Sequence, residues 1–181
     1  MAELDAKPLK GEFIRKASSF RNWITKDGSN GFQAESGRYH LYVSYACPWA
    51  HRTVITRRLK GLEDCISLNV VDYFMGEKGW RFNPEVEGCT SDTVNGFTHL
   101  SEVYFHANKD YGGRFTVPVL YDKKNRTIVN NESSEIIRMF NTEFNDFCKT
   151  DEQRALDVYP EYLKKQIDEL NEWIYKCVNG L

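Results

Sequence analysis

The sequence lacks the long apolar runs, basic surplus and leader-like N-terminus that mark several protein classes. It contains no run of about 18 apolar residues, so it predicts no transmembrane helix. Its first residues include Glu3, Asp5 and Glu12, and these acids argue against a secretory or mitochondrial presequence. The formal net charge of −2 gives no electrostatic reason to expect nucleic acid. We therefore expect a cytoplasmic protein with neither a membrane nor a nucleic acid as partner.

Cysteine is scarce and scattered. The chain holds five cysteines, namely Cys47, Cys65, Cys89, Cys148 and Cys177. An odd number without regular spacing is a poor disulfide framework. Neither these cysteines nor His99 and His106 form the close ligand pairs typical of a zinc site, so no metal is predicted.

One of these cysteines stands where a thiol becomes reactive. Cys47 follows an alternating strand over residues 39–45 and precedes a helix that begins at Pro48 and ends at Gly61. The unpaired N–H groups and dipole of a helix start stabilise a thiolate, and Arg52 one turn later adds positive charge. The alternative for a single cysteine is a small buried hydrophobe. The position of Cys47 favours the nucleophile.

The chemistry expected of Cys47 depends on what is absent beside it. Thioredoxin-type oxidoreductases carry a second, resolving cysteine three residues after the first, and Ala50 occupies that position here. A mixed disulfide on Cys47 would therefore be released by a small thiol from solution, most plausibly glutathione. We expect a glutathione site on the chain.

The order of the predicted elements is that of an α/β, thioredoxin-like fold. Strands over 39–45 and 66–71 flank the helix after Cys47 and form a βαβ unit. A second half follows, with a hairpin over 116–130 and a helix over 133–140. The long connection between the halves holds a short helix around Tyr104, and connections of this length are uncommon unless functional.

Two short motifs in the second half suit glutathione. A Val117–Pro118 pair at a strand start favours a cis bond, which would free the Val117 main chain to pair with a peptide, although an ordinary edge-strand proline also fits. Glu132 and Ser133 precede the last helix. Ser133 suits helix capping, while the N–H groups there suit a carboxylate and Glu132 suits an ammonium.

The chain resembles the glutathionyl-hydroquinone reductases, the Xi class of glutathione transferases. The blocks that carry the resemblance are residues 20–24 (FRNWI), 37–42 (GRYHLY), 46–53 (ACPWAHRT), 79–82 (GWRF), 116–120 (TVPVL), 130–133 (NNES) and 135–139 (EIIRM). These blocks follow the family's order, and the resemblance as a whole spans about residues 10–178.

This resemblance implies an activity and a site. Such enzymes use glutathione to remove glutathione from glutathionyl-hydroquinones, releasing hydroquinone and GSSG, and the match assigns the nucleophile to Cys47. The implied glutathione-binding residues are Trp80, Arg114, Val117, Pro118, Glu132 and Ser133. Glutathione and a quinone-derived conjugate are the implied substrates, and family members tend to form homodimers.

The expected domain organisation has three parts. Residues 1–36 form an N-terminal arm, residues 37–142 the thioredoxin-like glutathione-binding domain, and residues 143–181 a linker and the first helix of an all-α domain that looks truncated. The last part carries an apolar stripe at helical spacing, formed by Leu163, Ile167, Leu170, Ile174 and Val178. The resemblance places the acceptor pocket in the remainder of that helical domain.

Two other functions remain open at this point. One is an omega-like thioltransferase that acts on mixed disulfides, because the same monothiol chemistry needs less of an acceptor pocket. The other is a truncated, non-catalytic glutathione-binding module whose helix stripe docks on another chain.

Overall fold

The computed structural model describes residues 18–179, which divide into two compact units. The larger unit spans Ser19–Leu156, and the described part of the smaller one consists of Ser18 and residues 157–179. The larger unit starts earlier and ends later than the domain predicted over 37–142.

A four-stranded sheet lies at the centre of the larger unit, in the order β2-β1-β5-β6. Its strands are β1 (Tyr39–Val43), β2 (Ser67–Val70), β5 (Val119–Asp122) and β6 (Thr127–Asn130). β1 runs parallel to β2 and antiparallel to β5, and β5 runs antiparallel to β6. This is the predicted βαβ unit joined to a hairpin.

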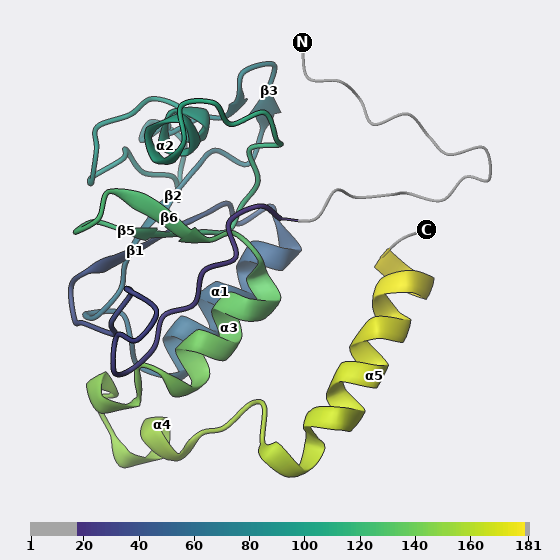
Figure 1. Cartoon of the computed structure of the whole chain (residues 1–181). Coiled ribbons are helices and arrows are strands. Elements are labelled where there is room, and N and C mark those ends of the chain that lie inside the picture. Colours follow the sequence, from purple (N-terminus) through teal and green to yellow (C-terminus); the bar gives the residue numbers. More distant parts are fainter. Residues whose placement is uncertain (1–17, 180–181) are drawn as a thin grey trace. The chain divides into compact units, whose positions relative to one another are not determined.

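Helices cover both faces of this sheet (Figure 1). They are α1 (Pro48–Leu59), α2 (Leu100–Ala107) and α3 (Ser133–Thr142). α1 and α3 pack against each other on one face, while α2 lies on the other. The thioredoxin-like fold predicted from the sequence is therefore confirmed, including the short helix in the long connection.

The central strand and the helix after it have clear local causes. All five residues of β1 are buried, as expected of a strand paired on both sides and covered by helices. α1 starts with Pro48 at its first position, where no N–H is needed. It ends at the cap residue Lys60, before Gly61 at φ 65°, a left-handed conformation that glycine adopts easily.

Residues 19–36 of the expected N-terminal arm belong to the larger unit. Asn22 N–H donates to the Val129 carbonyl at 3.0 Å, and Asn131 N–H donates to the Phe20 carbonyl at 3.1 Å. Ile24 is fully buried. The segment after residue 18 is thus bound along β6 and α3, whereas residues 1–17 of the predicted arm lie outside the described residues.

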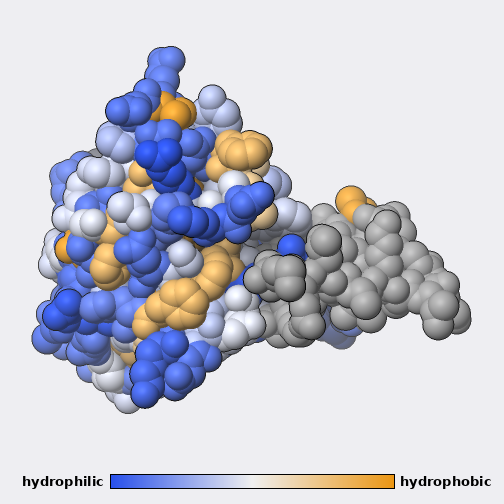
Figure 2. Space-filling view, turned by 90° about the horizontal axis from the view of Figure 1, so that it is seen from above, coloured by the Kyte–Doolittle hydropathy of each residue, from blue (hydrophilic) through white to orange (hydrophobic). Residues whose placement is uncertain are grey.

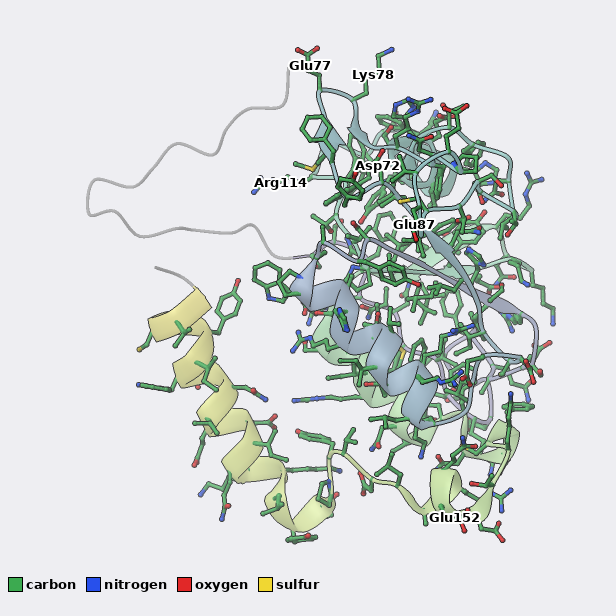
Figure 3. The ribbon with its side chains drawn as sticks, turned by 180° about the vertical axis from the view of Figure 1, so that it is seen from behind. Asp72, Glu77, Lys78, Glu87, Arg114 and Glu152 are labelled. Carbon is green, nitrogen blue, oxygen red and sulfur yellow. The ribbon has the colours of Figure 1, made fainter. Side chains whose placement is uncertain are left out.

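The connection between the two halves of the fold carries a small hairpin. It is formed by β3 (Met75–Gly76) and β4 (Gly79–Trp80), with Glu77 and Lys78 projecting outward at its tip (Figure 3). Tyr73, Phe74 and Met75 are exposed beside it. On the face shown in Figure 2, apolar residues form small separate patches within a mainly hydrophilic surface.

The chain beyond β6 continues in helices. α4 (Asp151–Ala155) belongs to the larger unit, and Thr150 caps it. In the smaller unit, a 3-10 turn (Glu161–Leu163) leads into α5 (Lys164–Ile174), which ends in a π turn (Tyr175–Asn179). Leu170 and Val178 of the predicted stripe are exposed. Among residues 18–179, no helix is long and apolar enough to cross a membrane.

Candidate active site

Cys47 lies at the N-terminal tip of α1, as the sequence predicts. It is the N-cap residue, with extended φ and ψ of −97° and 113°, and no side chain caps the helix there. The thiol is half-buried and its Sγ lies 3.6 Å from the Val117 carbonyl oxygen. The start of α1 and the segment just before β5 therefore meet at this thiol.

The peptide bond between Val117 and Pro118 is cis, which confirms that prediction. Both residues are buried at the entry to β5. Behind them, the hydroxyl of Tyr104 donates to the Thr116 carbonyl at 2.8 Å and accepts from Asn131 Nδ2 at 3.1 Å. Burial raises the pKa of Tyr104 to about 12, so this hydroxyl keeps its proton at neutral pH and holds the loop.

The start of α3 differs from the sequence prediction. Glu132, rather than Ser133, is the N-cap residue, and its carboxylate accepts from the backbone N–H of Ser134 at 3.2 Å. Ser133 is the first helical residue. The cause lies in the preceding turn, where Asn130 Oδ1 accepts from the Glu132 N–H at 2.7 Å and holds Glu132 extended. The predicted capping by Ser133 is wrong.

Ser133 instead contacts a residue of α1. The Nε and Nη2 groups of Arg52 donate to Ser133 Oγ at 3.0 Å and 2.7 Å, and Nη2 lies 3.7 Å from Glu132 Oε1. Burial lowers the pKa of the Arg52 guanidinium below its usual value, while Glu132 and Cys47 act in the opposite direction. Arg52 thus joins the helix of the thiol to the Glu132–Ser133 turn.

The contact between Arg52 and Ser133 is not predicted by the sequence. The sequence indicates only a supporting charge for Cys47, because Arg52 and Cys47 belong to one helix. The contact arises from the packing of α1 on α3. The only local signal is the position of Arg52 in the second turn of α1, with Thr53 and Thr56 buried nearby.

The two remaining predicted residues lie at the edge of the site. Trp80 is half-buried in β4, paired with Met75 across the hairpin and packed against the core. Arg114 is exposed in the loop before β5, where its carbonyl accepts from the Tyr111 hydroxyl at 2.9 Å. Figure 3 shows the Arg114 side chain projecting outward. Their roles toward a ligand stay predictions.

The arrangement supplies a nucleophile and a nearby site for a zwitterionic group. The thiol stands at the tip of α1. The start of α3 places the positive end of a helix dipole, which suits an anion, beside the Glu132 carboxylate, which suits a cation. Within residues 18–179, no group of three or more His, Cys, Asp or Glu side chains is arranged to hold a metal ion.

Comparison with known proteins agrees with this geometry. The profile of the family described as "Glutathione S-transferase, N-terminal domain" matches residues 46–143. The glutathionyl-hydroquinone reductase YqjG of Escherichia coli is 55% identical, over 97% of this chain and 54% of its own length. The resemblance noted in the sequence is thereby confirmed.

Solved structures give the same result. The glutathione S-transferase Xi of Phanerochaete chrysosporium superposes with a TM-score of 0.87 at 56% identity, over 92% of this chain and 56% of that one. A glutathione-bound structure of YqjG superposes with a TM-score of 0.81 at 56% identity, over 86% and 52% of the two chains. The chain thus spans about half the length of these relatives.

Proposed function

Because this chain belongs to the family of glutathione S-transferase N-terminal domains, we propose that it binds glutathione and reduces glutathionyl-hydroquinones with Cys47 as nucleophile. The observation that carries the proposal is the placement of a single thiol at the tip of α1, with Ala50 where a resolving cysteine would stand. The similarity to YqjG, a protein named for this reaction, supports the substrate class.

The proposed reaction has two steps that balance in atoms and electrons. The Cys47 thiolate attacks the sulfur of the glutathionyl thioether, an S–S bond forms and the C–S bond breaks. The electron pair of the broken bond goes to the ring carbon, which takes a proton, and hydroquinone leaves. A glutathione thiolate then attacks the mixed disulfide, so GSSG leaves and the Cys47 thiolate returns.

The remaining predicted residues receive roles around glutathione. The main chain of Val117 pairs with its cysteinyl unit, and Pro118 holds that turn. Glu132 and Ser133 bind the ammonium and carboxylate of its γ-glutamyl end, since they form the start of α3. Trp80 packs against glutathione, and Arg114 binds its glycyl carboxylate.

The setting of the enzyme belongs to the same proposal. We propose a cytoplasmic location, because reducing compartments keep thiols free and none of the described cysteines forms a disulfide. A homodimer is proposed from the resemblance alone, and gel filtration with light scattering tests it.

The decisive experiment measures GSSG formation in excess glutathione with two substrates, a glutathionyl-hydroquinone and a small mixed disulfide. Faster turnover of the hydroquinone conjugate supports the proposal, whereas turnover of the disulfide alone favours the thioltransferase. Cys47→Ser should abolish turnover of both while glutathione binding remains. Cys89→Ser is the matched control, because Cys89 is a half-buried thiol outside the site and its loss should change neither rate.

A further inference from the structure

The hydroxyl of Ser133 has an unusual set of partners. Serine offers one O–H donor and two acceptor lone pairs. Both hydrogen bonds of Ser133 Oγ come from the guanidinium of Arg52, at 3.0 Å and 2.7 Å, and both use the oxygen as acceptor. Since an arginine donates only, the serine proton has to point away from it.

That proton has no acceptor in the described part of the chain. Ser133 is 3% exposed, so bulk water contributes little. A nearly buried donor without an acceptor costs about 1–3 kcal/mol, and folded proteins rarely leave one unpaired. The acceptor is therefore expected from a ligand.

We infer that Arg52 is a positioning residue that makes the Ser133 hydroxyl an obligate donor to the α-carboxylate of the γ-glutamyl group. The inference rests on the proposed function and adds to it the origin of carboxylate selectivity. With Arg52 on its acceptor side, Ser133 cannot turn to accept from an ammonium or an amide N–H. The site then discriminates between ligands by that carboxylate.

The same guanidinium also lies near the Glu132 carboxylate. Arg52 Nη2 lies 3.7 Å from Glu132 Oε1, so one guanidinium touches both residues at the start of α3. Because Arg52 stands on α1 behind Cys47, it ties the place of the γ-glutamyl end to the place of the thiol.

The test compares the dissociation constants of three ligands by calorimetry under reducing conditions. They are glutathione, an analogue whose 4-aminobutyryl group lacks the α-carboxylate, and an analogue whose glutaryl group lacks the ammonium. In the unaltered chain we expect the carboxylate to strengthen binding about tenfold or more, as for hydrogen bonds to charged groups. We call the dissociation constant of the 4-aminobutyryl analogue divided by that of glutathione the carboxylate ratio. Arg52→Gln should reduce the carboxylate ratio about tenfold and leave binding of the 4-aminobutyryl analogue nearly unchanged.

Further variants separate this role from a structural one. Arg52→Gln in a Ser133→Ala background should add little to the loss, since Arg52 acts through the hydroxyl. Arg52→Lys keeps the positive charge but cannot donate two hydrogen bonds from a guanidinium to Ser133 Oγ. This variant should therefore lose most of the preference for ligands with the α-carboxylate. Arg58→Gln is the matched control, because Arg58 is exposed on the same helix and pairs with Glu63. Its carboxylate ratio should equal that of the unaltered chain.

Each other result overturns the inference. Equal weakening of all three ligands by Arg52→Gln would indicate a structural role, and unchanged ratios would exclude any role for Arg52. If Arg52→Lys kept the full preference for the α-carboxylate, action of Arg52 through the Ser133 hydroxyl would be contradicted. The same holds if the losses from Arg52→Gln and Ser133→Ala were additive in the double variant. If the unaltered chain binds none of the three ligands, the proposed function itself fails, and that outcome differs from all the others.

Discussion

Lys60 Nζ donates a hydrogen bond of 2.8 Å to the carbonyl of Leu156, although the Lys60 side chain is fully buried. A second carbonyl, that of Arg154, lies 3.5 Å from the same nitrogen. The ammonium at the end of α1 thus satisfies carbonyls at the end of α4, where a helix leaves them unpaired. This contact helps explain why the larger unit extends to Leu156.

Removal of that ammonium should destabilise the larger unit. We expect Lys60→Met to lower the free energy of unfolding by about 1–3 kcal/mol, because buried carbonyls lose a charged donor. Urea unfolding followed by circular dichroism measures the change. Lys78→Met is the matched control, since Lys78 is exposed at the hairpin tip and should shift stability by less than about 0.5 kcal/mol. Equal stability of the two variants would contradict the assigned role.

Alkylation should distinguish the thiols. At neutral pH, iodoacetamide is expected to modify Cys47 well before Cys65 and Cys89, because burial raises the pKa of the latter two thiols and so lowers their thiolate fraction. Peptide mass spectrometry over a time course measures the order. Modification of Cys65 ahead of Cys47 would argue against the proposed nucleophile, and the urea-unfolded chain, in which all thiols should react alike, provides the control.

The helix cap made by Glu132 and its proposed role in glutathione binding can be separated with two substitutions. Glu132→Gln keeps an oxygen to accept from the Ser134 N–H but removes the charge, so we expect near-normal stability and glutathione binding weakened about tenfold. Glu132→Ala removes both, and should also destabilise α3 by about 1 kcal/mol through loss of the cap. Calorimetry and thermal melts measure the pair. Unchanged glutathione affinity in both variants would refute the binding role.

His40 should make stability depend on pH. Burial lowers the pKa of His40 to about 4, below an unfolded value of about 6.5. The unfolded chain therefore binds the proton more readily, so stability is complete above pH 6.5 and falls as the pH drops toward 4. We expect a loss of about 1 kcal/mol by pH 5.5.

A matched pair of histidine variants tests that dependence. His40→Gln should abolish the fall in unfolding free energy between pH 7.5 and 5.5, whereas His106→Gln, at an exposed position, should retain it. Urea titrations at the two pH values measure the difference. The same slope in the His40 variant as in the unaltered chain would assign the dependence to other groups.

The parts of the fold that were predictable from the sequence depend on local signals. Pro48 at a helix start and Gly61 at its end act within a few residues, and both predictions hold in the structure. The alternation before Cys47 predicts the strand correctly, although all five residues of β1 are buried on both faces. The strand ends differ by one to three residues. β1 stops at Val43 because Tyr45 is already exposed at the turn to α1.

The parts that were not predictable depend on partners far apart in the chain. Arg52 and Ser133 meet only because α1 packs on α3, and no periodicity reports that contact. The Phe20 and Asn22 backbone bonds to β6 likewise give no sequence pattern. The wrong prediction that Ser133 caps α3 has a different source. Serine is usually the better N-cap, but the hydrogen bond from the Glu132 N–H to Asn130 Oδ1 holds Glu132 at the N-cap position.

The central position of β1 determines how readily heat can move the Cys47 thiol out of its native position. All its residues are buried and it is hydrogen-bonded on both sides, so its amides are expected to exchange with solvent only when the whole sheet opens. Cys47 follows that strand after a short turn. Heat should therefore not displace the Cys47 thiol by local melting, and loss of the proposed activity is expected to coincide with global unfolding.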